Sequence, residues 1–313
     1  MQKTHLILGI GELLWDMLPD GPRPGGAPAN FAVMAGQLGN HAAILSRIGR
    51  DELGNRAIER LNTMPIDASF IAVDPHHETG RVTVSFEAGE PQYTIHEPAA
   101  WDFLELSDAW LALAERADAL CFGTLAQRNQ QARQTIQTLV EKASDTCIRI
   151  FDVNLRAPFY SAEIIKESLE LSNVIKMNVA ETPLVLELLG LTIEDATGET
   201  LPTNIYLRAA SERLLQAFPS LRMVAITRGS RGSLLSTRDK WNEHPGFSVK
   251  VADSIGAGDA FTAALAHSML RGAGLATLNE AGNRWGSWMA SQSGAMPALP
   301  TNVRDAITAA IES

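Results

Sequence analysis

Short apolar runs alternate with amphipathic segments along most of the chain, which is typical of strands and helices in turn. The first apolar run, residues 4–10, leads to helical spacing over residues 28–38, which stops at Gly39. The same alternation predicts further strands at residues 42–48, 119–122, 148–152, 174–177 and 223–226, and further helices at residues 52–64, 127–142 and 164–171. The predicted fold class is therefore α/β, with a mostly parallel central sheet and helices on both of its faces.

Residues 69–97 break this rhythm with three short segments that alternate polar and apolar residues, without a helix between them. Together with residues 12–20 they predict a small antiparallel sheet, inserted into the main domain as a lid. The C-terminal part predicts three helices, at residues 257–270, 276–291 and 303–311. Repeats and long Gly/Ser linkers are absent from the sequence, so we expect one domain over residues 1–313.

The composition narrows the class of protein. Of the 313 residues, 45% are hydrophobic and 20% are charged, as in ordinary globular domains. The formal net charge of −10 argues against nucleic acid as a partner, because phosphate backbones attract basic surfaces. Apolar runs stay well short of the ~20 residues of a membrane helix, so we expect no membrane partner. Two cysteines, Cys121 and Cys147, are too few for a disulfide framework and favour the reducing cytoplasm.

The strongest local signal for chemistry is the segment DSIGAGDAF at residues 253–261. Gly256 and Gly258 lie where a loop enters a helix, so the freed backbone amides and the helix dipole predict an anion site suited to phosphate. Asp259, in the first helical turn, would point into the same pocket and accept a proton from an attacking hydroxyl. Alternatively, Asp259 only complements the helix dipole, by roughly 0.3–1 kcal/mol, and the glycines only serve the turn.

Three further polar clusters each have a functional and a plain structural interpretation. Residues 25–30 (GGAPAN), close in sequence to Asp16, suit sugar hydroxyls or form a tight turn before a helix. Asn178 and Glu181, after a strand, suit Mg²⁺ held through water or form a capping box. Residues 227–232 (TRGSRG) suit phosphates or a ribose, or form a hairpin turn. On the residues alone these alternatives stay open.

Asp152, Asn154 and Arg156 alternate off the end of a predicted strand, so they share one face and either line a crevice or lie in a solvated loop. Several other signatures are missing from the sequence: the GxxxxGK[ST] phosphate loop, GxGxxG opening a helix, HExxH and GxSxG. P-loop ATPases, dinucleotide dehydrogenases, zincins and serine hydrolases therefore have no support from the sequence.

The order of these motifs resembles the ribokinase (PfkB-type) family of carbohydrate kinases over nearly the whole chain. The N-terminal signature of that family is similar to residues 25–30, 38–39 and 48–54, and its C-terminal signature is similar to residues 253–261. Between them stand an NxxE match at residues 178–181 and a TxGxxG match at residues 227–232. The resemblance implies ATP-dependent phosphorylation of a sugar, on a three-layer sandwich with a β-sheet lid over the substrate.

The resemblance also implies roles for individual residues. Asp259 would be the catalytic base, and the amides of Gly256, Ala257 and Gly258 the anion hole. Six residues would bind the sugar: Asp16, Gly25, Gly26, Asn30, Asn154 and Arg156. Six would bind the nucleotide: Asn178, Glu181, Thr227, Gly229, Gly232 and Asn283. Of these, Glu181 would also hold Mg²⁺ through water. Asp253 and the carbonyl of Ile255 would hold K⁺, and the family resemblance allows a homodimer through the lid.

Within the family, the opening GELLWDMLPDG and the DxNxR match at residues 152–156 look most like fructokinases, so we expect D-fructose as the substrate. Residues 93–102 depart from the fructokinase lid pattern, where an aromatic-rich segment is followed by Ser-Ala-Asp. Kinases of 2-keto-3-deoxygluconate, ribose or a nucleoside are the alternatives within the family. A further alternative is a non-catalytic sugar-binding protein on the same fold, which the intact Asp259 argues against.

Overall fold

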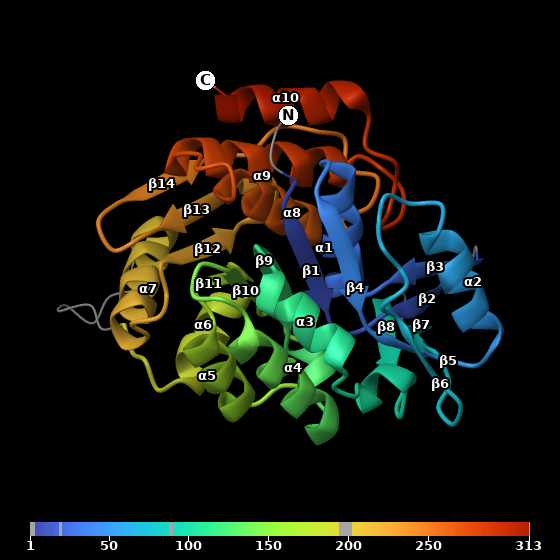
Figure 1. The fold of residues 1–313 in the computed structure, drawn as a ribbon. Helices are drawn as coiled ribbons and strands as arrows, with labels where there is room; N and C mark the ends of the chain where they lie inside the picture. The colour runs from blue at the N-terminus through green and yellow to red at the C-terminus, as the bar shows by residue number, and fades with distance from the viewer. Residues whose placement is uncertain (1–3, 19–20, 88–89, 194–201, 313) are drawn as a thin grey trace.

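The computed structural model describes residues 4–18, 21–87, 90–193 and 202–312. Within these residues an eight-stranded sheet forms the middle of the molecule, in the order β14-β13-β12-β11-β10-β9-β1-β4 (Figure 1). Six of these strands are parallel: β4, β1, β9, β10, β11 and β12. Strands β13 and β14 add an antiparallel edge. The strands of this sheet are β1 (Leu6–Ile10), β4 (His41–Leu45), β9 (Ala119–Gly123), β10 (Ile148–Asp152), β11 (Val174–Asn178), β12 (Met223–Thr227), β13 (Ser233–Ser236) and β14 (Trp241–His244).

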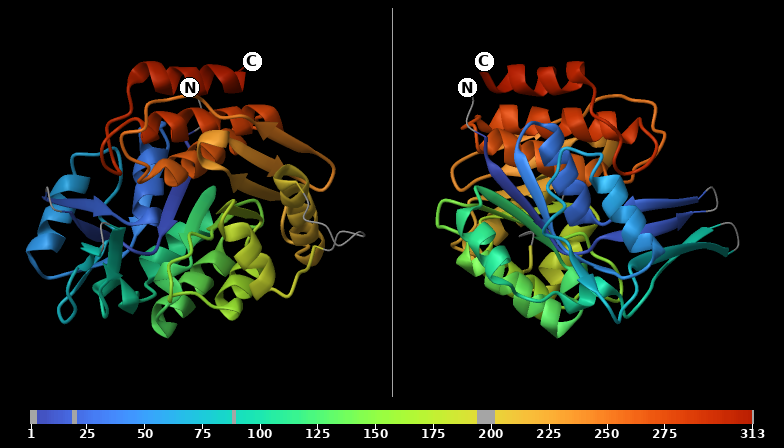
Figure 2. Two further views of the ribbon diagram at one scale, coloured as in Figure 1. Left: turned by 180° about the vertical axis from the view of Figure 1, so that it is seen from behind. Right: turned by 45° about the vertical axis from the view of Figure 1, so that its right-hand side comes forward.

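Helices cover both faces of this sheet (Figure 2). Alternate strand residues point to opposite layers. On β1, Ile7 packs in one core cluster and Leu8 in the other. The first layer is α1 (Ala27–Gln37), α8 (Ala257–Met269) and α9 (Leu275–Ala290), with α10 (Thr301–Glu312) outside α9. The second layer is α3 (Asp108–Arg116), α4 (Gln130–Lys142), α5 (Ala162–Leu171), α6 (Glu181–Leu188) and α7 (Thr203–Ala217). The predicted three-layer α/β sandwich is confirmed.

A separate four-stranded sheet stands beside the central sheet, in the order β3-β2-β7-β8 (Figure 2). Its strands are β2 (Leu14–Leu18), β3 (Gly21–Gly25), β7 (Gly80–Glu87) and β8 (Glu90–Ile95). We call this sheet the lid. It is mostly antiparallel, as predicted, but β2 and β7 run parallel. Strand β3 was not predicted, because its GPRPG segment reads as a turn; proline is tolerated there because β3 is an edge strand.

The prediction that residues 69–73 belong to the lid is wrong. The strand in this region, β6 (Ala72–Asp74), pairs instead with β5 (Arg47–Gly49) in a two-stranded parallel sheet. Asp74 is buried, and its carboxylate lies 3.0 Å from Arg47 Nε, which ties the two strands together. The predicted strand 42–48 therefore breaks at Ser46 and serves two sheets. The remaining elements are α2 (Glu52–Leu61) and the 3₁₀ turns η1 (Ala100–Phe103), η2 (Leu125–Gln127) and η3 (Gly229–Arg231).

Cys121 and Cys147 are both buried and free. Burial raises the pKa of the Cys147 thiol to about 12, so it stays protonated at neutral pH. In the part of the chain that the structure describes, no helix combines the length and the apolar character needed to cross a membrane.

Candidate active site

The predicted site residues gather at the carboxyl-terminal edge of the parallel strands, beside the N-terminus of α8. Open α/β sheets bind ligands at this edge. Arg156 follows β10, Asn178 ends β11 and Thr227 ends β12. Asp259 lies in the first turn of α8. Segments that are far apart in the sequence thus meet at one place.

Asp259 is in direct contact with a residue predicted to bind sugar. Its Oδ2 accepts a hydrogen bond from Asn30 Nδ2 at 2.7 Å, which joins α8 to α1. Gly26 is the N-cap of α1, and Gly25 approaches Asp16 so closely that a Cβ on Gly25 would lie 2.7 Å from Asp16 Oδ2. The residue 25–30 cluster, Asp16 and the start of α8 therefore form one site rather than two.

A buried ion pair lies beneath this site and was not predicted. Lys176 Nζ contacts both carboxylate oxygens of Asp152, at 3.0 and 2.9 Å, and Thr262 Oγ1 donates to the same carboxylate at 3.2 Å. A Cβ on Gly258 would lie 2.8 Å from Lys176 Nζ, so this glycine is needed for the close approach of α8. The signal in the sequence was a lysine inside an otherwise apolar strand, because lysine is seldom buried without a partner.

The carboxylates of the site have perturbed proton affinities. Burial raises the pKa of Glu12 to about 7, and the nearby Asp259 adds to this shift. Burial also raises the pKa of Asp259 to about 6. For Asp16, burial again raises the pKa, whereas Arg156 lowers it. The positive charge of Arg156 lowers the pKa of Glu12, Asp16 and Asp259. This exposed arginine, in the loop after β10, is therefore close to the site.

Asn154 marks where the predicted alternation after β10 ends. Its φ is 39°, in the left-handed region that asparagine tolerates better than most residues. Asp152, two residues earlier, points into the buried ion pair, whereas Arg156 is exposed. Of the three residues predicted to share a face, Asp152 is therefore beneath the site and Arg156 at its rim.

Asn178 and Glu181 form the predicted helix cap. Asn178 Oδ1 accepts the N–H groups of Ala180 and Glu181, at 2.8 and 2.9 Å, and Glu181 Oε2 accepts the N–H of Asn178 at 2.7 Å. Glu181 Oε1 accepts the N–H of Leu155 at 2.9 Å. Each carboxylate oxygen of Glu181 accepts one N–H and keeps a second lone pair, so Glu181 can still accept a hydrogen bond from a water of a hydrated Mg²⁺. Among the described residues, no group of three or more His, Cys, Asp or Glu side chains forms a metal cage.

A cavity of about 490 Å³ extends from the start of α8 to the loop after β12. It brings together six of the predicted residues: Ala257, Gly258, Thr227, Gly229, Gly232 and Asn283. Phe247, Val249 and Val251 add an apolar wall that the sequence analysis missed. Val249 and Val251 are exposed large apolar side chains, and no motif in the sequence marked them. Asn178 and Glu181 do not line this cavity.

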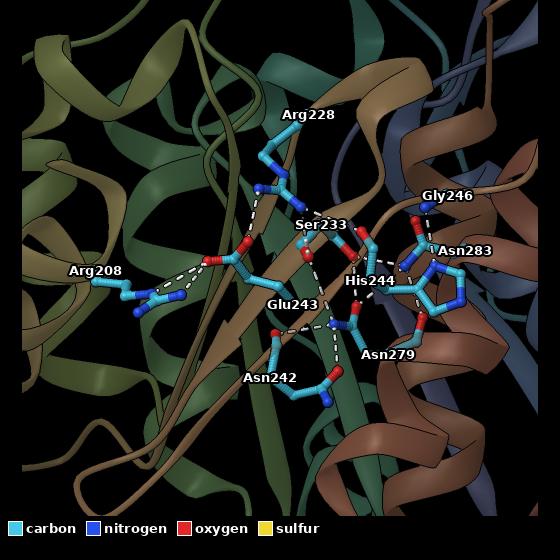
Figure 3. Close-up of polar contacts among 9 residues, drawn as sticks. All are labelled: Arg208, Arg228, Ser233, Asn242, Glu243, His244, Gly246, Asn279 and Asn283. Carbon is cyan, nitrogen blue, oxygen red and sulfur yellow. Dashed lines mark hydrogen bonds and ion pairs between the residues drawn. The ribbon is translucent and has the colours of Figure 1, made fainter. Parts of the chain in front are cut away.

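Figure 3 shows the polar contacts that hold Asn283, one of the residues lining this cavity. Asn283 Nδ2 donates to Ser233 Oγ at 2.6 Å, and Ser233 Oγ donates to Asn279 Oδ1. Asn279 Nδ2 in turn donates to Asn242 Oδ1 at 2.8 Å. This chain of buried amides connects α9 with β13 and β14. Asn283 is therefore fixed by polar contacts within the protein, and its amide nitrogen is already used.

Two more contacts shape the loops around the cavity. A Cβ on Gly232 would lie 1.9 Å from His244 O, so the turn after β12 packs directly on the end of β14. The amide of Ala257 donates to Ser254 O at 3.3 Å, so one of the three predicted anion-hole amides already has a partner. Asp253 holds the same loop, because its Oδ1 accepts the N–H of Ile255 at 3.0 Å and its Oδ2 accepts that of Gly294 at 3.3 Å.

Together these features describe a phosphotransferase site: a carboxylate of raised pKa at a glycine-rich helix start, between the polar cluster of Asp16, Asn30 and Arg156 and a long cavity. Comparison with known proteins agrees. The model of the pfkB family of carbohydrate kinases matches residues 21–302, so this chain belongs to that family and is a sugar kinase that uses ATP.

Relatives cover almost the full chain at low identity. An uncharacterized sugar kinase of Pyrococcus horikoshii is 28% identical over 86% of this chain and 84% of its own, and its structure in complex with ATP superposes with a TM-score of 0.75 over 93% of this chain and 94% of that one. The fructokinase of Escherichia coli is 28% identical over 93% of this chain and 95% of its own. A Vibrio cholerae fructokinase, solved with fructose, ADP and a calcium ion, is 26% identical. It superposes with a TM-score of 0.77 over 97% of this chain and 99% of its own.

Proposed function

We propose that this sugar kinase phosphorylates D-fructose. The contact between Asn30 and Asp259 carries the proposal, because it joins a carboxylate of raised pKa to the polar cluster of Asp16, Asn30 and Arg156, next to the cavity. Asp16 and Arg156 would give that cluster acceptors and donors for several hydroxyls, as a sugar requires. Relatives named fructokinase support the choice of fructose.

In the proposed reaction the sugar hydroxyl lies between Asp259 and the γ-phosphate of ATP. The hydroxyl oxygen forms a bond to the γ-phosphorus while the bond from that phosphorus to the ADP oxygen breaks, and the hydroxyl proton moves to Asp259. Asn30 orients the carboxylate, and the free amides at Gly256 and Gly258 receive the charge on the transferred group. Lys176 places a further positive charge below these amides.

The nucleotide would occupy the cavity, with its base against the wall of Phe247, Val249 and Val251. Thr227, Gly229 and Gly232 would follow the ribose and phosphates, beside Asn283. Mg²⁺, when bound with ATP, neutralises phosphate charge, and Glu181 would reach it through water. Glu181 also ties the loops after β10 and β11 together, so it would position Arg156 as well.

A coupled assay of ADP release tests the substrate. The panel contains D-fructose, ribose, 2-keto-3-deoxygluconate and adenosine, and Asp259→Asn serves as the inactive control. We expect the highest kcat/KM with fructose. A higher kcat/KM with another member would contradict fructose and leave the sugar kinase intact. ADP release that continues unchanged in Asp259→Asn would contradict the base.

We further propose that two copies associate through their lids. The lid has two edge strands, β3 and β8; the prolines of β3 leave it few outer N–H groups, so β8 is the edge that can pair with a second sheet. Tyr93 on β8 is 63% exposed and would be covered by a partner at this edge. Light scattering after gel filtration should give twice the mass of one chain, and Tyr93→Asp should shift the protein to the monomer.

A further inference from the structure

An arginine of the lid reaches the loop that leads into α8. Arg23 lies on β3, and its Nη1 is 3.8 Å from Asp253 Oδ2 and 3.2 Å from Ser293 Oγ. These contacts join three segments: the lid, the loop before α8 and the loop after α9. Both charged side chains are largely shielded from solvent, with 30% and 20% of their surfaces exposed.

This arrangement does not fit the K⁺ ion that the family resemblance predicts at Asp253 and Ile255. Both carboxylate oxygens of Asp253 already accept backbone N–H groups, from Ile255 and Gly294. The oxygen on the Gly294 side also faces the guanidinium of Arg23. A potassium ion needs oxygen ligands, whereas a guanidinium offers only N–H donors and repels a second cation.

The carboxylates of Asp16 and Asp253 nevertheless favour a positive charge near them. Asp16 lies directly opposite Arg23 in the register of β2 and β3, so the two side chains share a face of the lid. The charge of Asp253 also acts on Asp16. Arg23 is thus the cross-strand neighbour of one of two carboxylates that repel each other, and its guanidinium lies 3.8 Å from the other.

We propose that the guanidinium of Arg23 takes the place of the activating monovalent cation in this protein, which therefore works without K⁺. Asp253 fixes the loop that leads to Gly256, the N-cap of α8. In this arrangement the start of α8 is held in place by a side chain of the lid rather than by a soluble ion. The lid contact and the phosphate-binding helix are then parts of one unit.

The test compares KCl, NaCl and tetramethylammonium chloride at equal ionic strength, with two readouts: kcat/KM for the accepted sugar, and the Tm of the protein without substrate. For the natural chain we expect less than about a twofold difference in kcat/KM among the salts and the same Tm in each. For Arg23→Gln we expect kcat/KM in tetramethylammonium to fall by about 5- to 150-fold, the usual range of coupling between an effector site and a ligand site, and to recover in KCl. The Tm of this variant should rise in KCl only.

Two controls keep the test sharp. Arg81→Gln removes another lid arginine, which pairs with exposed Glu78 at 3.1 Å, and should behave like the natural chain. Arg23→Lys keeps the charge, so it should stay independent of K⁺. If Arg23→Gln fails to fold, the comparison of salts on the natural chain decides the proposal. A natural chain that K⁺ activates would overturn the proposal, and so would an Arg23→Gln variant that ignores K⁺ in both readouts. Because the Tm needs no sugar, the outcome is separate from the choice of fructose.

Discussion

Replacing either member of the buried Asp152–Lys176 pair should move the acid limb of the pH–activity profile, and the two replacements should move it in opposite directions. Asp259 must be ionised to accept a proton, so activity should rise with pH through the pKa of this carboxyl. Burial is the largest cause of its raised pKa of about 6; the charge of Asp152 adds to the shift, and Lys176 opposes it. Burial therefore accounts for most of the raised pKa, and the two charges of the pair shift it in opposite directions.

The size of the effect follows from these two charges. An opposite charge close to a carboxyl changes its pKa by about 1–3 units. In Lys176→Met the pKa of Asp259 should therefore rise to about 7–9, and its ionised fraction at pH 7 should fall from about 90% to about half or less. In Asp152→Asn the pKa should fall toward the ordinary value of 3.8, so activity persists to lower pH.

The assay is kcat/KM for the sugar between pH 5 and pH 9, with saturating ATP and Mg²⁺. Lys176→Met leaves Asp152 buried without its partner, which can cost about 3–5 kcal/mol, so circular dichroism must show a folded protein at each pH. The double variant Asp152→Asn/Lys176→Met removes both charges and should return the acid limb close to that of the natural chain. The reasoning fails if both single variants shift the limb in the same direction, or if the limb of the natural chain lies near pH 4.

Three further predictions concern single side chains. Asp259→Asn should lower kcat by about 10²- to 10⁴-fold. A carboxyl whose pKa is raised on folding opposes folding above that pKa. The same variant should therefore increase the free energy of unfolding at pH 8 by up to about 3 kcal/mol in urea titrations. Asp16→Ala should chiefly raise KM for the sugar, by about 10- to 150-fold in steady-state kinetics; an unchanged KM would exclude it from the sugar site. Burial lowers the pKa of His267 to about 3, so the unfolded chain takes up this proton first as pH falls below its ordinary 6.5. The natural chain should then lose about 1.4 kcal/mol of stability per pH unit between about pH 6 and pH 4 relative to His267→Gln, and parallel stability curves would contradict this.

The sequence predicted the layers and most of the site because both depend on local signals. Apolar periodicity marks the strands of a parallel sheet, and glycine-rich segments such as residues 253–261 mark their own loops. The assignment of residues 69–73 failed because strand partners are chosen by contacts distant in sequence, here the ion pair of Asp74 with Arg47. Strand β3 had no local signal at all, since two prolines conceal a strand that only an edge position permits.

The arrangement of charges within the site was also beyond the sequence. Lys176 appears in the sequence as one lysine among apolar neighbours, and only the pairing of β10 with β11, which sets Asp152 beside it, reveals the partner that keeps it charged. Arg23 lies in a segment that reads as a turn, 270 residues from the serine it contacts. Such contacts depend on which loops converge in space, which periodicity and composition do not encode.

The hydrogen bond between Asn30 and Asp259 has a consequence for how the protein is made. Its two residues are 229 positions apart, and helix α1, which carries Asn30, packs against α8. During synthesis α1 can pack on β1 and β4, but its contact with α8 forms only after the ribosome has released the C-terminal helices. Contacts of such long range make folding slow and leave apolar surface open to aggregation in the meantime. We expect nascent chains that stop before residue 257 to need chaperones, and the sugar and phosphate sites to appear together, late, in one step.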